Sequence, residues 1–232
     1  MNSKAKSPNN AKLDVFELLR SQITSLELMP GSPIDVSSLR RKLSVSITPI
    51  RDALKRLTER QLLTFTPGSG YHVIALTSKE IEDAFRLRMI IEISLLPRAV
   101  ELVPLTRVKQ VRAKMLHLSI DTLSGSKFRS EFDRLDDELH QGLIVRSSGN
   151  RFATMAIEVT GDFLAIARHL NDRIPESILE HIYILDAWMD GNTQEATRLL
   201  SLHLKSSLTA CISPRKQAPH EPVRSSHLRE AA

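Results

Sequence analysis

Apolar residues recur every three or four positions over most of the chain, which predicts a mainly α protein. The first such stretch, residues 13–26, ends before Pro30-Gly31-Ser32-Pro33, and a short one follows at residues 36–43. A third begins near residue 48, where Thr48 is expected to cap a helix and Pro49 to take its first position. Two short helices joined by a tight connection are typical of a helix-turn-helix.

Two strand-like stretches follow the third helix, at residues 63–66 and 71–74. The intervening Pro67-Gly68-Ser69-Gly70 predicts a hairpin turn. A hairpin directly after a helix-turn-helix is read as a wing. We therefore predict a winged helix-turn-helix domain over residues 11–77.

Beyond residue 77 the strand pattern disappears and helical spacing continues to residue 212. Thr77 and Glu80 form a capping box that predicts a helix over residues 78–102, which Pro97 should kink or interrupt. The sequence therefore predicts an all-helical antiparallel bundle over residues 78–212. Its further helices are expected at residues 107–122, 128–146, 151–170, 175–189 and 194–212.

Charge divides the chain at the same boundary. Residues 1–77 contain 11 Lys and Arg against 6 Asp and Glu, whereas residues 78–212 contain 17 against 19. A basic first domain favours double-stranded DNA as its partner. The compositions of residues 1–10 and 213–232 predict disordered ends. With a single cysteine and no apolar run long enough to span a bilayer, we expect a cytoplasmic, nucleoid-associated protein with no membrane partner.

The third helix carries a basic face. Arg51 lies three residues after the expected cap, near the positive end of the helix dipole, where a cation costs about 0.3–1 kcal/mol. Arg51 and Lys55 form one ridge. A solvated basic face would show the same pattern, but the helix-turn-helix context favours a recognition helix. The opposite face is apolar and contains Ile50, Leu54 and Leu57.

Four residues of the predicted bundle form a candidate metal site. Asp136 and His140 stand four residues apart and therefore share a helix face. His181 and His203 lie about ten residues on either side of the Gly191-Asn192 turn, so they should reach a similar height on adjacent helices. Three imidazoles and one carboxylate suit a divalent metal such as Zn, Ni or Mn, with one position open for a ligand. Surface histidines with an unrelated carboxylate are the simpler alternative.

The run Val45-Ser46-Ile47-Thr48-Pro49-Ile50-Arg51-Asp52-Ala53-Leu54 resembles the recognition segment of the GntR family of bacterial transcription regulators, commonly V-S-R-T-P-V-R-E-A-L. The resemblance implies DNA contacts from Ser46, Thr48, Arg51 and the wing glycine Gly68. Where the family often has Arg, this chain has Ile47, which could instead contact a thymine methyl group. With the neighbouring basic residues, the candidate DNA-binding set is Arg40, Arg41, Ser46, Ile47, Thr48, Arg51, Lys55 and Gly68.

The helical part resembles the FCD ligand-binding domain of the FadR subgroup of this family. The resemblance implies that the metal is bound by the Asp/His₃ set and that Arg88 approaches an effector carboxylate. The residues that carry it are Arg88 with Glu92, Asp136 with His140, Ser148-Gly149-Asn150, Glu180-His181 and His203-Leu204.

Together these features predict a metabolite-responsive regulator, expected to be a repressor, that binds a pseudo-palindromic operator as a homodimer. A small carboxylate effector at the metal site would favour one arrangement of the two reading heads. Two alternatives stay open: a metal-dependent hydrolase-like enzyme, and a helical domain whose metal is purely structural. The enzyme is disfavoured because no H-E-x-x-H or comparable general-base motif lies beside the ligands.

Overall fold

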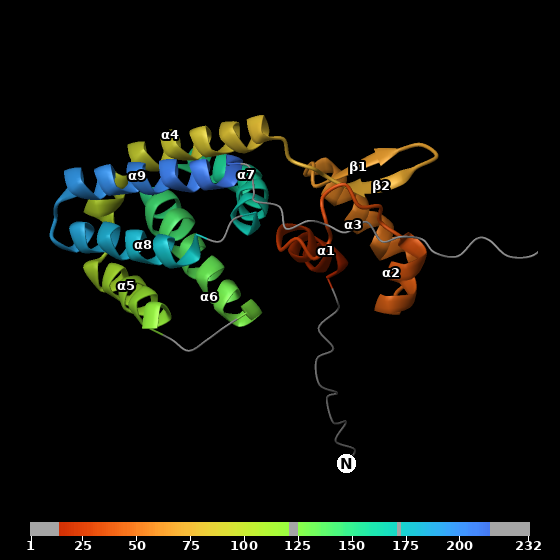
Figure 1. Ribbon diagram of the computed structural model, residues 1–232, viewed down its shortest axis with the longest axis horizontal. Helices are drawn as coiled ribbons and strands as arrows, with labels where there is room; N and C mark the ends of the chain where they lie inside the picture. The colour runs from red at the N-terminus through yellow and green to blue at the C-terminus, as the bar shows by residue number, and fades with distance from the viewer. Residues whose placement is uncertain (1–13, 121–124, 171–172, 214–232) are drawn as a thin grey trace, which may run out of the picture.

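A hairpin-bearing group of short helices is followed by a bundle of longer ones in the computed structural model, which describes residues 14–120, 125–170 and 173–213 (Figure 1). Asp14 and Asp35 cap the first two helices by accepting hydrogen bonds from backbone N–H groups of the first turn. The expected disordered ends fall almost wholly outside the described residues. The first part contains α1 (Val15–Thr24), α2 (Val36–Leu43), α3 (Ile47–Glu59) and the antiparallel strands β1 (Leu63–Thr66) and β2 (Gly70–Val73).

The recognition helix α3 begins earlier than the sequence suggested. Ser46, not Thr48, is its N-cap, although the Ser46 side chain makes no capping hydrogen bond. Pro49 is thus the third helical residue, which is tolerated because the first N–H groups of a helix have no intrahelical partner. Arg51 lies a turn inside the helix, so the dipole opposes its charge less than expected.

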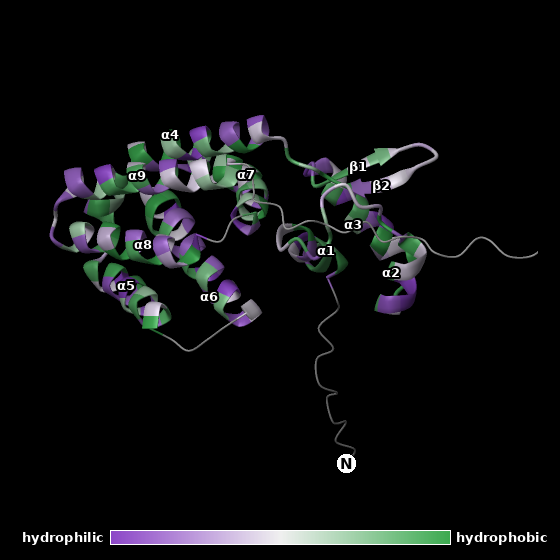
Figure 2. Cartoon of the chain, in the orientation of Figure 1, coloured by the Kyte–Doolittle hydropathy of each residue, from purple (hydrophilic) through white to green (hydrophobic). Residues whose placement is uncertain are grey.

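The predicted apolar face of α3 is buried, and this confirms the helical spacing of its residues. It packs against α1 and the start of the hairpin, and forms the core of the winged-helix domain. The basic residues of α3 remain on the outside, and the outer end of α2 is hydrophilic as well (Figure 2). The central members of this core are Phe16, Leu19, Ile23, Ile50, Leu54, Leu57 and Leu63.

The second part is an all-helical bundle, as predicted. The capping box of Thr77 and Glu80 is present at the start of its first helix, and Pro97 does not interrupt that helix. None of the helices in the described ranges is long and apolar enough to cross a membrane. The bundle consists of α4 (Ser78–Leu102), α5 (Leu105–Ile120), α6 (Gly125–Asp137), α7 (Arg151–His169), α8 (Ile174–Met189) and α9 (Thr193–Ile212).

The single helix predicted over residues 128–146 is wrong. After α6, the chain continues as a π-helical segment, η1 (Glu138–Val145), and then as a 3₁₀ turn, η2 (Arg146–Ser148). A π-turn holds one more residue than an α-turn, a difference that apolar spacing over so short a stretch does not reveal. A Cβ atom at Gly142 would lie 3.0 Å from Oε2 of Glu138, so the absence of a side chain there leaves room for that carboxylate.

The two domains meet where α7 lies beside α1 (Figure 1). The buried carboxylate of Asp162 accepts a hydrogen bond from Nε of Arg20 at 2.7 Å and one from Nη1 of Arg60 at 3.4 Å. Ile166, one turn further along α7, belongs to the core of the winged-helix domain. The bundle therefore contacts the DNA-binding domain through both a charged and an apolar contact from one helix.

This contact predicts that Asp162→Ala lowers the free energy of unfolding. Two charge-assisted hydrogen bonds are lost, but both guanidinium groups are part-exposed, so the loss should be about 1–2 kcal/mol. Urea unfolding measures it. The control is Glu158→Ala, which removes an exposed carboxylate from the same helix and should change stability by less than about 0.5 kcal/mol. Equal effects of the two substitutions would contradict the proposed role of Asp162.

Candidate metal centre and DNA-binding surface

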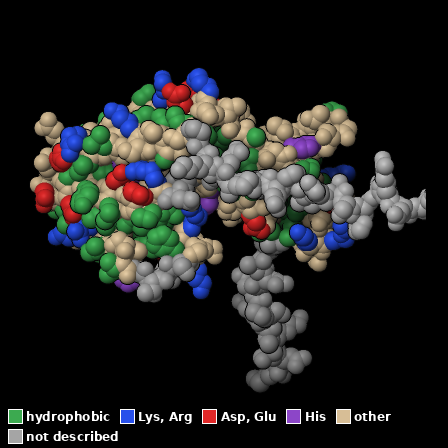
Figure 3. Space-filling view, viewed as in Figure 1, with side chains coloured by type: hydrophobic (Ala, Val, Ile, Leu, Met, Phe, Trp, Pro, Cys, Tyr) green, Lys and Arg blue, Asp and Glu red, His purple; other side chains and the backbone are tan. Residues whose placement is uncertain are grey.

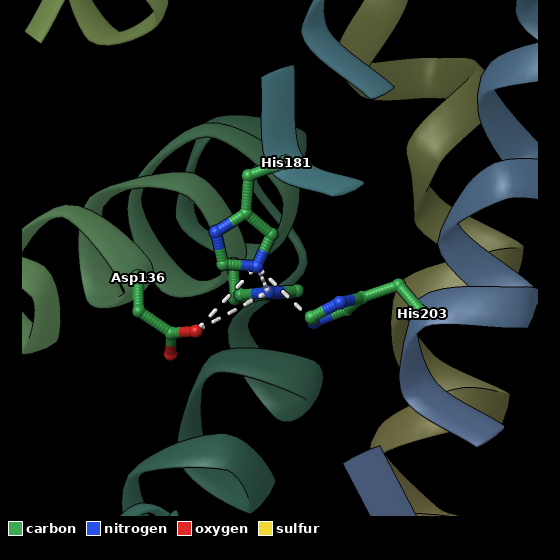
Figure 4. Close-up of side chains that lie close together, drawn as sticks. Asp136, His181 and His203 are labelled. Carbon is green, nitrogen blue, oxygen red and sulfur yellow. Dashed lines mark hydrogen bonds and ion pairs between the residues drawn. The ribbon is translucent and has the colours of Figure 1, made fainter. Parts of the chain in front are cut away.

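The four predicted metal ligands come together in the interior of the bundle. Asp136 lies in the last turn of α6, His140 lies in η1, and His181 and His203 face each other from α8 and α9 (Figure 4). Nε2 of His181 is 3.2 Å from Nε2 of His140 and 3.1 Å from Nε2 of His203. Oδ1 of Asp136 is 3.6 Å from the same nitrogen. All four side chains are buried, and one ligand atom from each lies within 4.8 Å of the others.

Two carboxylates fix the orientation of two of these rings. Nδ1 of His140 donates to Oε2 of Glu92 at 2.6 Å, and Nδ1 of His203 donates to Oε2 of Glu180 at 2.7 Å. A proton held on Nδ1 leaves the lone pair of Nε2 directed into the cluster. The ring of His181 is stacked on Phe132, with centroids 6.0 Å apart. The side chains around the cluster thus orient the histidine rings so that their Nε2 lone pairs point to one position.

This arrangement fits a divalent metal ion. Lone pairs that face each other at 3.1–3.2 Å repel unless a proton or a cation lies between them. Zn–N bonds of about 2.0–2.1 Å place neighbouring ligand nitrogens roughly 2.9–3.4 Å apart, which matches the observed spacing. Three imidazoles with one carboxylate could therefore hold zinc or a similar first-row metal.

Burial keeps the imidazoles in the form that binds metal. Desolvation, together with the neighbouring histidines, lowers the pKa of His181 well below its usual value, and desolvation also lowers the pKa of His203. Both rings are therefore neutral near pH 7. Burial by itself would raise the pKa of Asp136, but Arg168, His140 and Arg88 outweigh it and hold the pKa far below its usual range. Asp136 is thus ionised and available as a ligand.

Two guanidinium groups lie beside the cluster, that of Arg88, which is buried, and that of Arg168, which is partly buried. Nε of Arg88 donates to Oε1 of Glu92 at 2.7 Å, and its Nη2 is 3.9 Å from Oδ2 of Asp136. Arg168 of α7 donates to that same oxygen of Asp136. Burial would raise the pKa of Glu92, yet the charge of Arg88 and the hydrogen bond from His140 lower it to about 2. A cavity of about 10 Å³, with room for roughly one water molecule, lies among these side chains.

Sequence reasoning missed part of this site. Arg168 follows Asp136 by 32 residues and belongs to another helix, so no local spacing connects the two. Glu92 and Glu180 were noted only as parts of motifs, and their hydrogen bonds to the histidine rings were not foreseen. The one available signal was general: metal-binding histidines usually donate their second N–H to an oxygen, but this rule does not say which carboxylate accepts it.

The predicted DNA-contacting residues occupy α2, α3 with its N-cap, and the wing. All are exposed except Ile47, which is half-buried as the first residue of α3. Gly68, with φ of +83°, lies in the hairpin turn, where a residue with a side chain would be strained. The wing and α2 lie away from the bundle in Figure 1, and Lys and Arg side chains gather over α2 in Figure 3. This end of the molecule is accessible and basic.

Both domains of the chain are similar in sequence to known protein families. Residues 11–73 match the bacterial regulatory proteins of the gntR family, and residues 83–206 match the FCD domain. The HTH-type transcriptional regulator YdhC of Bacillus subtilis is 27% identical over 86% of this chain and 90% of its own. The HTH-type transcriptional repressor RspR of Escherichia coli is 24% identical over 82% of this chain and 84% of its own.

Solved structures agree with the fold. Escherichia coli McbR/YncC superposes with a TM-score of 0.71 at 19% identity, over 85% of this chain and 94% of that one. The Zn²⁺-bound FCD domain of TM0439, described as a transcriptional regulator, has a TM-score of 0.51 at 26% identity and covers 60% of this chain and 95% of its own.

The fold and the matched regions define a DNA-binding transcriptional regulator with a helical effector domain. The chain belongs to the gntR family of bacterial regulatory proteins, in the group that carries an FCD domain. It is a regulator and not an enzyme, so the hydrolase alternative is set aside.

The lowered histidine pKa values generate a pH prediction for the metal-free protein. The unfolded chain binds protons at His181 and His203 near the ordinary pKa of about 6.5, whereas the folded protein binds them only at lower pH. The free energy of unfolding is therefore greatest above about pH 6.5 and falls as the pH falls through that value, by up to about 1.4 kcal/mol per pH unit for each proton. Urea unfolding between pH 7.5 and pH 5 tests this.

Two variants control the measurement. His181→Ala should show a smaller pH dependence and bind less zinc, whereas His117→Ala, a change at an exposed histidine of α5, should behave as the unmodified protein does. A free energy of unfolding that does not change over this pH range would refute the assignment of the buried neutral rings.

Proposed function

We propose that this regulator is a repressor that binds a pseudo-palindromic DNA operator as a homodimer and is controlled by a small carboxylate bound at a metal ion, with zinc as the favoured metal. The observation that carries the proposal is the buried Asp/His₃ cluster with two guanidinium groups directed at its carboxylate. The name of the relative RspR supports repression, and the zinc-bound relative supports the metal.

Charge balance favours an anionic effector. Asp136 and Glu92 are ionised, and Arg88 and Arg168 neutralise them. A divalent cation at the histidines would add two positive charges to a buried site, which is costly without a counter-charge. A carboxylate supplies such a charge and can accept hydrogen bonds from a guanidinium group. Arg88 and Arg168 would orient it.

One helix connects this site to the DNA-binding domain. Arg168 reaches the cluster from α7, and Asp162, six residues earlier, holds Arg20 and Arg60 of the DNA-binding domain. A ligand that changes the position of α7 would therefore also change the position of the DNA-binding domain. Because such coupling is reciprocal, operator DNA must change the effector affinity by the same factor.

The DNA-binding surface predicts that Arg51→Ala weakens operator binding by about tenfold. The substitution should also reduce the slope of log affinity against log salt concentration by about 1, because one phosphate-neutralising charge is lost. Binding is measured by fluorescence anisotropy on an operator selected from genomic fragments. Arg198→Ala, at an exposed arginine of α9, is the control and should leave both quantities unchanged. An unaltered salt slope for Arg51→Ala would count against the recognition helix.

We propose that the homodimer forms through the face of α5 and α8. These two helices pack together, and apolar side chains gather over them in Figure 3. A two-fold dimer places two reading heads on one operator, as a pseudo-palindrome requires. The exposed apolar residues of these two helices include Leu116, Ile120, Leu179 and Tyr183.

We expect Tyr183→Glu to shift the protein from dimer to monomer, because a buried unpaired carboxylate is costly at an interface. Sedimentation velocity measures the shift. The matched control is Val159→Glu, at a second exposed apolar position, on α7. Dissociation caused by Val159→Glu and not by Tyr183→Glu would place the interface on α7 instead.

A further inference from the structure

A polar hollow of about 580 Å³ opens between the two domains. One wall is α1 of the DNA-binding domain, and the other is formed by α6 and α7 of the bundle. Apart from Gly161 and Ala165, the residues that line it are polar or charged. Hydroxyl groups are frequent among them: Ser21, Thr24, Ser25, Ser126 and Ser130.

The hollow shares a wall with the small cavity beside the metal cluster. Asp137, Gln141, Gly161 and Arg168 line both. Because the cavity itself has room for roughly one water molecule, a carboxylate with more than a few atoms must extend out of it. Across the shared wall lies the hollow, which has enough space for the rest of such a ligand.

Gly161 keeps this wall thin. A glycine inside a helix such as α7 is less stable than an alanine by about 0.5–1 kcal/mol, so its presence needs a reason. A Cβ atom at this position would meet only Nε2 of Gln141, at 3.7 Å. Alanine would therefore fit, whereas a longer side chain would fill the space between the cavity and the hollow.

We propose that α1 of the DNA-binding domain forms part of the effector site, and that the effector is a carboxylate with a hydroxylated chain. The carboxylate lies at the metal end beside Arg168, and the chain passes Gly161 into the hollow, where it reaches Ser21. This inference rests on the proposed function, because it extends the same site across the domain boundary.

The lining chemistry selects a hydroxylated chain over a hydrocarbon one. Hydroxyl groups both donate and accept, which matches a wall that offers serine hydroxyls, carboxylates such as Asp133 and guanidinium groups such as Arg20. A hydrocarbon chain would cover these groups without replacing their hydrogen bonds to water. A ligand that contacts both α1 and α7 makes different contacts when the two domains are arranged differently. It therefore binds one arrangement more tightly than another, and this difference in affinity shifts the equilibrium between the arrangements.

The test compares three probes on the full chain loaded with zinc: acetate, pentanoate and ribonate, a five-carbon carboxylate with four hydroxyl groups. Isothermal titration calorimetry should give an affinity for ribonate about tenfold or more above that for acetate and pentanoate, as expected from one or two net hydrogen bonds. Hydrogen exchange should slow in α1 with ribonate and not with acetate.

Variants locate the chain of the ligand. Ser21→Trp fills the hollow from an exposed position of α1 and should remove the advantage of ribonate while leaving acetate affinity unchanged. Gln22→Trp changes the next residue, which does not line the hollow, and should retain the advantage. Gly161→Leu should also remove the advantage of ribonate, whereas Gly161→Ala should retain it.

The outcomes separate this inference from the function on which it rests. If the unmodified chain binds neither zinc nor acetate, the result counts against the metal site itself. With zinc and acetate binding intact, the inference is overturned if pentanoate binds as tightly as ribonate, if ribonate has no advantage, or if Ser21→Trp leaves that advantage in place.

Discussion

The ionised carboxylate of Asp136 is the group on which the arrangement of the bundle depends. It is buried, and two guanidinium groups from different helices, Arg88 on α4 and Arg168 on α7, keep it charged. The same residue lies one helical turn from His140 and faces His181. A buried charge is tolerated only with such partners. The packing of α4, α6 and α7 around Asp136 is thus fixed by electrostatics as well as by apolar contact.

Helix α7 connects this buried chemistry to the surface that meets DNA. Arg168 reaches inward to the cluster, while Asp162 and Ile166 reach outward to α1 and the core of the winged-helix domain. A rigid helix transmits a displacement at one position to the other because its backbone hydrogen bonds resist local deformation. The position of α7 is therefore shared between two sites that the sequence places in separate domains.

The sequence was sufficient wherever a local rule determined the structure. Helical spacing located the helices, the capping box located the start of α4, and equal distances from the Gly191-Asn192 turn brought His181 and His203 together. It was insufficient where the deciding contact is long-range, as for Arg168, or where two local structures share one pattern. At α3, the sequence could not decide between Ser46 and Thr48 as the cap, because a proline is tolerated at any position of the first helical turn and Pro49 fits both choices.

The π-helical segment η1 constrains how many residues this part of the chain can contain. Arg107 of α5 holds two points of the chain, Glu138 at the start of η1 and Ser147 in the following turn η2, by donating to the carboxylate of Glu138 at 2.6 Å and to the hydroxyl of Ser147 at 3.3 Å. Each residue of an α-helix turns the chain by about 100°. Removing one residue between Glu138 and Ser147 would restore ordinary helix and rotate one of these two residues away from Arg107. The number of residues here is therefore constrained independently of their identity, and insertions or deletions should be tolerated far less than substitutions.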